Sequence, residues 1–297
     1  MLAGVDLGGS KIEAILLGGD GTELLRTRCP TPAGDYPATL KAIAALHRQM
    51  ETRAGRQLPL GLGTPGSLSP ATGLMRNANS TCLNGHNLKA DLEDLLNRPL
   101  RMANDADCFT LSEAVDGAGQ GAPTAFGVII GTGTGGGIAV HGHLLDGPNA
   151  IAGEWGHNPL PWPDRDELPG PGCWCGKQGC IETFLSGPGL AAEHQRRTGQ
   201  ALAGPDIVAS AAEDDALARE TLAIYEHRLA RSLAGIINIL DPHVIVLGGG
   251  LSGIERLYEN VPRLWEPYVF SDVCTTRLLP PTHGDSSGVR GAAWLWR

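Results

Sequence analysis

The amino-acid sequence predicts an α/β protein built from two related halves. Two observations support this prediction. A hairpin pattern with a glycine-rich first turn occurs twice, and apolar stretches of strand length alternate with segments whose apolar residues recur at helical spacing. A further glycine turn follows a later apolar strand, so that three such turns punctuate the chain.

The two hairpins share the order of their parts. The first has a strand, a glycine turn, a second strand and a second turn, at Leu2–Asp6, Gly8-Gly9, Ile12–Leu17 and Gly18–Gly21. The second has the same parts at Ala125–Ile130, Gly131–Gly137, Ile138–Val140 and Gly142. This repetition predicts an internally duplicated architecture.

The third glycine turn follows a predicted helix. Apolar residues recur at helical spacing between residues 229 and 240, and Asp241-Pro242 ends the helix because proline cannot continue it. The apolar strand Val244–Leu247 then enters Gly248–Gly250. Two other helices are predicted, at Ala38–Arg53 and Gly288–Trp296. A domain boundary is predicted near Gly117–Pro123, and a loop at Pro159–Gly172.

Composition and charge exclude several classes of protein. Of the 297 residues, 42 % are hydrophobic, which is enough for two domain cores and argues against disorder. The net charge of −9 argues against a nucleic-acid partner, because a phosphate backbone requires a basic face. Apolar runs such as Phe126–Ile130 are too short to cross a bilayer, and the first residues show no export signal. We therefore expect a cytoplasmic protein that begins at or near Met1.

The glycine turns are candidate phosphate-binding loops. Glycines let backbone N–H groups approach phosphate oxygens closely, since no Cβ intervenes. In the first turn we expect Ser10 to donate to a phosphate, Lys11 to neutralise its charge and Asp6 to hold Mg²⁺ through water. The candidate nucleotide-binding residues are Asp6, Gly8, Gly9, Ser10, Lys11, Thr132, Gly133, Thr134, Gly135, Gly249 and Gly250.

For any one of these loops, the alternative is an ordinary tight turn without a ligand. Three such turns, each directly after an apolar strand, favour phosphate binding instead. Neither hairpin turn fits the P-loop pattern GxxxxGKS/T. The N-terminal turn also lacks the GxGxxG pattern and the downstream ribose-binding acid of a Rossmann dehydrogenase.

A candidate catalytic acid follows a short apolar stretch in the sequence Asn104-Asp105-Ala106-Asp107. Phosphoryl transfer needs a positioned nucleophile, a carboxylate that accepts its proton, and stabilisation of charge. We expect Asp105 to be this base and Asn104 to help hold the acceptor. The alternative is that Asp105 or Asp107 caps the helix that follows, and the residues alone leave both readings open.

Three of the seven cysteines lie within eight residues, at Cys173, Cys175 and Cys180. The others are scattered, and an odd total makes a poor disulfide framework. With His157 upstream, the three thiolates form a closed set typical of structural zinc, and interleaved glycines let the loop fold tightly. The alternative is ordinary buried thiols. If zinc binds one ring nitrogen of His157, the other carries a hydrogen in a fixed direction and could donate to an acceptor hydroxyl beside Glu154. The same loop would position Glu182.

Taken together, these residues resemble the ROK family of bacterial sugar kinases over essentially the whole chain. The motifs that carry the resemblance are GVDLGGSK at 4–11, GLGTPGSLSP at 61–70, NANST at 77–81, ANDAD at 103–107, IIGTGTGGG at 129–137, GEWGHNPLPW at 153–162, CWCGKQGCIE at 173–182 and VIVLGGGLS at 244–252. One departure is Ser10, where the family usually has threonine, and the hydroxyl is kept.

The resemblance implies a ribonuclease-H/actin-like ATPase fold with two domains around a cleft for ATP and sugar. It implies an N-terminal domain at 1–117 completed by a C-terminal helix at 286–297, a second domain with the zinc loop at 118–285, and a homodimer. It makes Asp105 the general base and implies ATP, Mg²⁺ and structural zinc as cofactors. It assigns the sugar to Asn79, Asn104, Glu154, His157 and Glu182, and zinc to His157, Cys173, Cys175 and Cys180.

A finer resemblance, to fructokinases (manno(fructo)kinases) of this family, rests on GEWGHNPLPW, NANSTCLNG and HGDSSGVRGAAWLW. It predicts phosphorylation of D-fructose at O6, with mannose as a second substrate. The alternatives are an N-acetylglucosamine kinase or glucokinase of the same family, a sugar sensor without turnover, and an actin-like chaperone or filament protein. Repressors of the family carry a DNA-binding domain before the kinase-like part, and we expect none here because DLGG begins at Asp6.

Overall fold

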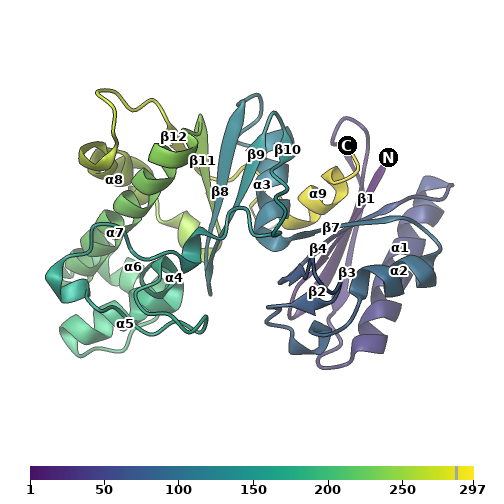
Figure 1. Ribbon diagram of the computed structural model, residues 1–297, viewed down its shortest axis with the longest axis horizontal. Helices are drawn as coiled ribbons and strands as arrows, with labels where there is room; N and C mark the ends of the chain where they lie inside the picture. Colours follow the sequence, from purple (N-terminus) through teal and green to yellow (C-terminus); the bar gives the residue numbers. More distant parts are fainter. Residues whose placement is uncertain (285–286) are drawn as a thin grey trace. The chain divides into compact units, whose positions relative to one another are not determined.

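The computed structural model describes residues 1–284 and 287–297 (Figure 1). These residues form two compact units. The first contains residues 1–121, 137–152 and 282–297, and the second contains residues 122–136 and 153–281. Residues 285 and 286, where the second predicted domain ends and the terminal segment begins, lie outside the described residues.

A five-stranded sheet in the order β3-β2-β1-β4-β7 forms the centre of the first unit. Its strands are β1 (Leu2–Leu7), β2 (Lys11–Leu17), β3 (Glu23–Pro30), β4 (Leu60–Thr64) and β7 (Leu100–Asn104). β1, β2 and β3 form an antiparallel meander, whereas β1, β4 and β7 run parallel. A separate small ribbon pairs β5 (Ser67–Leu68) with β6 (Met75–Arg76).

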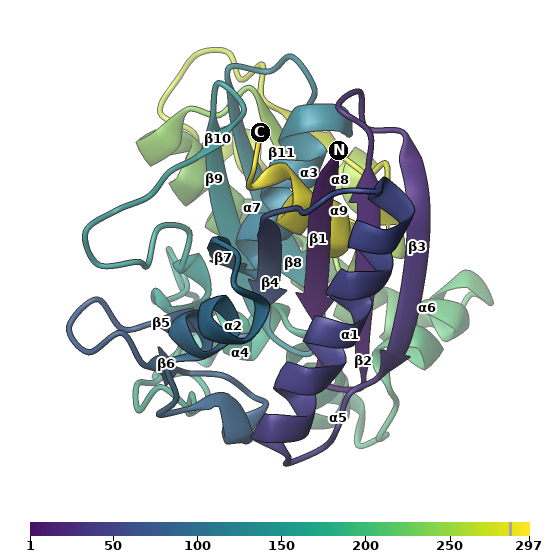
Figure 2. The same ribbon diagram turned by 90° about the vertical axis from the view of Figure 1, so that its right-hand side faces the viewer.

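Helices cover both faces of this sheet, as the alternation of side chains along β2 requires (Figure 2). Ala14 and Leu16 belong to the core under α1 and α2, whereas Ile15 and Leu17 belong to the core under α3 and α9. The helical segments of this unit are α1 (Tyr36–Ala54), the 3₁₀ turn η1 (Thr81–Leu83), α2 (Leu88–Leu96), α3 (Asp105–Asp116) and α9 (Ser287–Trp294).

Glycines allow α9 to lie close against the sheet and α3. A Cβ at Gly61 of β4 would overlap the carbonyl oxygen of Ala292 in α9, and a Cβ at Gly291 would overlap that of Cys108 in α3. The short apolar C-terminal helix predicted from residue 288 is therefore confirmed, and it is a core element of the first unit. Packing at this density tolerates no added methyl group without movement of the backbone.

The second sheet repeats the plan of the first, in the order β10-β9-β8-β11-β12. Its strands are β8 (Thr124–Ile130), β9 (Thr134–Val140), β10 (His143–Leu144), β11 (Val244–Gly248) and β12 (Arg277–Leu279). β9 and β10 are antiparallel, whereas β8, β11 and β12 are parallel. The predicted α/β class with duplicated glycine-turn hairpins is confirmed.

The predicted second hairpin was wrong in one detail, since β9 begins at Thr134 and not at residue 138. The glycines of this stretch lie largely within the strand and make room for neighbours. A Cβ at Gly136 would come within 2.8 Å of the Trp155 ring, and one at Gly137 within 2.5 Å of the Thr110 hydroxyl oxygen. The glycine run was therefore only partly a turn, because some of its glycines are present to allow close packing within a strand.

The 25-residue helix α7 (Ala216–Leu240) organises the second unit and contacts α4, α5, α6 and α8. It ends, as predicted, at Asp241-Pro242, where Asp241 takes the left-handed conformation with φ 48°. The other helical segments are η2 (Trp155–His157), η3 (Arg165–Glu167), α4 (Ile181–Leu185), α5 (Gly187–Thr198), α6 (Gly204–Ala212), η4 (Gly250–Gly253), α8 (Arg256–Trp265) and η5 (Glu266–Tyr268).

A buried ion-pair network ties the loop at 159–172 to α7. The Glu167 carboxylate lies 2.7 Å from Arg228 Nε and 2.8 Å from Arg231 Nη2, and all three side chains are almost fully buried. Burial alone would raise the pKa of Glu167, but the hydrogen bond from Arg228 and its other donors outweigh burial and lower it. The loop is thus held by hydrogen-bonded charges, because it offers few apolar side chains of its own.

Within residues 1–284 and 287–297, no helix combines the length and the hydropathy that a membrane crossing requires.

Candidate active site and metal centre

The predicted base Asp105, with Asn104 and Asp6 from the predicted sugar and nucleotide sites, lies at one edge of the first sheet. β1, β4 and β7 are parallel, and their register sets Asp6 beside Gly63 and Gly63 beside Ala103. Asp6 and the Asn104–Asp105 pair therefore share the carboxyl edge, where open α/β sheets bind their ligands. Gly63 keeps this edge open, since a Cβ there would lie 3.3 Å from Asp6 Oδ1.

Asn104, and neither of the aspartates, caps helix α3. Its Oδ1 accepts a hydrogen bond of 2.6 Å from the Asp107 backbone N–H, which is N-cap geometry. Asp105 is the first residue of the helix, and its Oδ1 accepts a bond of 2.9 Å from the Ala106 N–H. The alternative in which Asp105 or Asp107 serves as the cap is therefore wrong, because the asparagine one residue earlier takes that place.

The carboxylates at this edge have raised pKa values. The Asp105 side chain reaches solvent, but protein surrounds its carboxylate closely enough that desolvation raises its pKa. Desolvation, together with the charges of Asp105 and Glu13, raises the pKa of Asp6 to about 6, against a lowering by Lys11. Coupled acids with raised pKa values at a ligand-binding edge are typical of a functional site.

The first glycine turn lies next to this edge. The Gly8 N–H donates to the Lys11 carbonyl over 3.0 Å, which closes the turn. Gly9 faces Ser80, since a Cβ on Gly9 would lie 3.8 Å from the Ser80 hydroxyl, and the exposed Asn79 directly precedes that serine. The Lys11 ammonium lies 3.1 Å from the Glu13 carboxylate, so a phosphate would have to compete with Glu13 for it.

In the second unit, two glycine turns meet at the carboxyl ends of neighbouring parallel strands. β8 enters Gly131 and β11 enters Gly249, and a Cβ on Gly131 would lie 3.9 Å from the Gly250 nitrogen. Gly249 has φ 83°, and a Cβ there would collide with the Ile130 backbone. Only glycine fits that position without strain.

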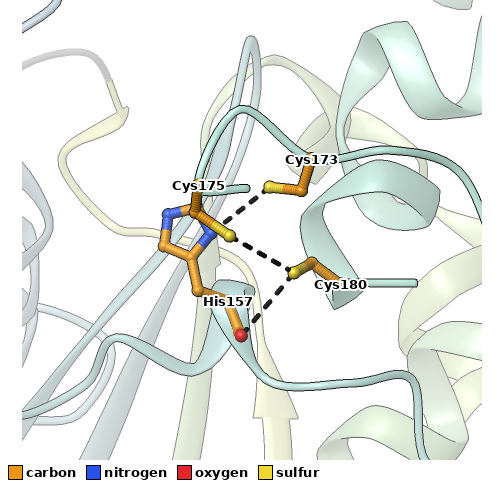
Figure 3. A group of neighbouring side chains, drawn as sticks. All are labelled: His157, Cys173, Cys175 and Cys180. Atoms are coloured by element: carbon orange, nitrogen blue, oxygen red, sulfur yellow. Dashed lines mark hydrogen bonds between the residues drawn. The ribbon is translucent and has the colours of Figure 1, made fainter. Parts of the chain in front are cut away.

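His157, Cys173, Cys175 and Cys180 converge on one point of the second unit (Figure 3). Their ligand atoms all lie within 4.8 Å of one another. Cys175 Sγ is 3.7 Å from Cys180 Sγ, and Cys173 Sγ is 3.6 Å from His157 Nδ1. A tetrahedral ion with Zn–S of ~2.3 Å and Zn–N of ~2.0 Å gives an S–S edge of about 3.8 Å and an S–N edge of about 3.5 Å. The donor set and its geometry therefore fit zinc.

Two other predicted residues, Glu182 and Glu154, follow and precede the residues of this cluster in the chain. The Glu182 carboxylate accepts from the Thr134 backbone N–H at 3.0 Å and from the Trp174 indole N–H at 2.7 Å. The exposed Glu154 precedes Trp155, which is buried and donates its indole N–H to the Gly135 carbonyl over 2.8 Å. Nδ1 of His157 lies toward Cys173 Sγ, and a zinc ion bound at Nδ1 would leave Nε2 to carry the proton.

The structure thus groups the predicted site residues by unit. Asp6, Asn104 and Asp105 gather at the carboxyl edge of the first sheet, beside the first glycine turn. The second unit gathers its residues around the metal cluster and the other two glycine turns. Sequence reasoning did not single out Trp174, which bonds to the predicted residue Glu182.

The comparison with protein families identifies the chain. The sequence profile of the ROK family matches residues 2–297. This chain belongs to the ROK family. The N-acetyl-D-glucosamine kinase of Vibrio vulnificus (strain YJ016) is a relative that is 38 % identical over 299 residues, covering 99 % of each chain. The α/β, actin-like ATPase fold predicted from the sequence is confirmed by this membership.

Solved structures of ROK proteins are similar to the present one. The ROK hexokinase from Thermus thermophilus superposes with a TM-score of 0.88 at 29 % identity, over 99 % of this chain and 96 % of that one. A ROK family glucokinase from Streptomyces griseus, solved with glucose and AMPPNP, superposes with a TM-score of 0.78 at 25 % identity, over 99 % and 98 %. The finer resemblance to fructokinases is not confirmed by these relatives.

The pKa of Asp105 gives this ROK protein an expected pH dependence. If Asp105 accepts the proton, activity needs its ionised form, and desolvation raises its pKa above the ordinary aspartate value of about 3.9. We expect the acid-side fall of kcat/KM to lie at a higher pH than an ordinary aspartate would give, measured as ADP release at saturating MgATP. Far-ultraviolet circular dichroism at each pH is the control for folding. A fall that begins only at the ordinary aspartate pKa would contradict a base with a raised pKa.

Proposed function

We propose that this chain is an ATP-dependent sugar kinase that phosphorylates a hydroxyl of a free hexose, with N-acetyl-D-glucosamine as its preferred acceptor. The observation that carries the kinase proposal is the position of Asp105, directly after β7 at the carboxyl edge of the parallel strands β1, β4 and β7, beside Asp6 and the first glycine turn. ROK family membership supports the same reaction.

In the proposed reaction, Asp105 accepts the proton of the acceptor hydroxyl while the γ-phosphoryl group of ATP is transferred in line. Desolvation suits Asp105 to this role, because a carboxylate with a raised pKa is a better proton acceptor than an ordinary one. Asn104 Oδ1 accepts the hydrogen bond that caps the helix, so the amide N–H groups of Asn104 are available to a sugar hydroxyl. The capping bond also fixes the direction of that amide.

The phosphates of ATP are proposed to bind to backbone N–H groups of the glycine turns. Gly131 and Gly250 lie close together at the ends of β8 and β11, and the neighbouring residues Thr132 and Gly249 are exposed. Mg²⁺ would be held through water by Asp6, and it would neutralise charge that develops on the phosphoryl oxygens. Lys11 exchanges its contact with Glu13 for a phosphate in this proposal.

Zinc is proposed to be structural. His157, Cys173, Cys175 and Cys180 fill a tetrahedral set, which leaves no open position for a substrate. The ion would tie the loop at 173–180 to His157 and thereby direct the histidine Nε2–H. Glu154, His157 and Glu182 would then offer two acceptors and one donor to the sugar.

N-acetyl-D-glucosamine is proposed as the acceptor because of the names that the curated relatives carry. The Vibrio vulnificus protein, at 38 % identity over 99 % of its length, is named an N-acetyl-D-glucosamine kinase. The predicted preference for fructose, with mannose second, rests on short segments, whereas this likeness covers the whole chain. We therefore favour the N-acetylated sugar, which was the alternative from the sequence.

A coupled assay of ADP release with MgATP tests this proposal. We expect N-acetylglucosamine to give the highest kcat/KM in a panel with N-acetylmannosamine, glucose, mannose and fructose. A highest value for fructose would restore the original prediction and leave the kinase reaction in place. If none of the five sugars releases ADP, the kinase proposal fails, and a sugar sensor without turnover becomes the better description.

A further inference from the structure

Trp174 is an exposed aromatic residue in an ordered setting. It lies between Cys173 and Cys175, and 67 % of its surface is accessible to solvent. Exposure by itself indicates little, since Phe270 and Ile239 are more exposed still. The difference lies in the polar and ring contacts that fix the indole.

Two contacts hold the indole of Trp174 in one orientation. Its Nε1–H donates to Glu182 Oε1 over 2.7 Å, a short bond to a charged acceptor. Its ring also meets the His157 ring edge to face, with centroids 4.9 Å apart and an interplanar angle of 87°. Both partners are residues that we propose to bind the sugar. The indole is therefore fixed beside the polar groups of the site while much of its surface stays open.

The Glu182 carboxylate is fixed from two sides. Oε1 accepts from Trp174, and Oε2 accepts from the Thr134 backbone N–H over 3.0 Å. A carboxylate has about four lone-pair positions, so these two bonds orient the group and leave capacity for donors of a ligand. A ligand N–H or O–H that reaches Glu182 arrives next to the indole of Trp174.

This pairing of an anionic acceptor with an adjoining apolar ring defines the chemistry of a ligand group. The group must present a hydrogen-bond donor with an apolar part only a few ångströms away. An acetamido group does this, because its N–H can donate to the carboxylate while its methyl covers the ring. A hydroxyl of an unmodified hexose satisfies the carboxylate but brings only the C–H groups of the sugar ring to the indole, which is a smaller apolar contact than the added methyl makes.

We propose that Trp174 is a specificity-determining residue of the sugar site. Its N–H holds Glu182 in place, and its exposed ring contacts the acetamido methyl of an N-acetylated hexose. This inference rests on the proposed function, and it adds the residue that makes an N-acetylated sugar a better ligand than the plain hexose. It requires no movement of the zinc loop and no change in the phosphoryl transfer itself.

Calorimetric titration of the zinc-loaded protein with N-acetylglucosamine and with glucose, without ATP, tests the inference. We expect Trp174→Ala to lower the affinity for N-acetylglucosamine at least tenfold. We expect it to lower the ratio of the affinities for N-acetylglucosamine and glucose by about fivefold or more. Trp174→Phe keeps a ring but loses the N–H, and we expect it to recover part of that preference. Trp162→Phe is the matched control, because Trp162 is half exposed and packs on Tyr268, and it should leave both affinities unchanged.

Two further readouts separate specificity from structural damage. Zinc content should stay at about one ion per chain in every variant. The indole fluorescence quenched by N-acetylglucosamine in the wild type should be lost in Trp174→Phe and kept in Trp162→Phe. If Trp174→Ala lowers the affinity for both sugars equally, or lowers neither, the inference is overturned while the kinase proposal stands. If the wild type binds neither sugar, the proposed function and this inference fall together.

Discussion

Asp105→Asn is expected to lower kcat by about 10²- to 10⁴-fold, the range that general-base catalysis contributes. The asparagine keeps the size of the side chain and its place at the start of α3, so the sugar and ATP should still bind. The predicted signature is therefore a loss of kcat with the KM for sugar changed by less than about threefold. Steady-state ADP release and calorimetric sugar binding measure the two parts separately.

Asp107→Asn is the matched control for this experiment. Asp107 lies in the same first helical turn, and its backbone N–H rather than its side chain bonds to the Asn104 cap. We expect its kcat to stay within about tenfold of the wild type. If the two variants lose activity equally, or if only Asp107→Asn does, the assignment of the base to Asp105 is wrong.

Cys175→Ser is expected to remove zinc and to loosen the sugar-binding loop. Metal binding and local folding are coupled, and the loop at 173–180 has few buried apolar side chains that hold it without the ion. We expect zinc to fall from about one ion per chain to a small fraction, and the unfolding temperature to drop by roughly 5–10 °C. Sugar affinity should fall as well, because His157 and Glu182 lose their support.

Cys274→Ser tests whether loss of any cysteine has this effect. Cys274 is partly buried and lies outside the metal cluster. The zinc content, unfolding temperature and sugar affinity of the Cys274→Ser protein should therefore match those of the wild type. Mass spectrometry under non-denaturing conditions measures the zinc, and scanning calorimetry measures the unfolding. Full zinc content and an unchanged unfolding temperature in Cys175→Ser would exclude a structural zinc site.

Much of the architecture was predictable because it depends on local pattern. Short apolar runs bounded by glycine turns indicate strands such as β1 and β2, and Asp241-Pro242 ends α7 whatever surrounds it. The cysteine spacing with its interleaved glycines was likewise a local signal, and the structure brings these side chains within reach of one ion. The likeness to the ROK family, read from short motifs, is confirmed over residues 2–297.

Other features were not predictable because they depend on neighbours far along the chain. The strand β9 begins earlier than its glycines indicated, since two of them make room for Trp155 and Thr110. The cap of α3 could have been any of three polar residues, and only the helix start observed assigns it to Asn104. The narrow choice between sugars was read from segments too short to decide it.

By itself, the sequence determined the α/β class, the duplicated hairpins, the family and the residue types available for chemistry. These follow from periodicity, glycine placement and motif spacing, which are properties of neighbouring residues. Only the tertiary structure decided that the charge of Asp105 helps to raise the pKa of Asp6, that Glu167 is buried between Arg228 and Arg231, and that Trp174 bonds to Glu182. Such pairings depend on strand register and loop closure, because electrostatic and hydrogen-bond energies fall off within a few ångströms whatever the separation in sequence.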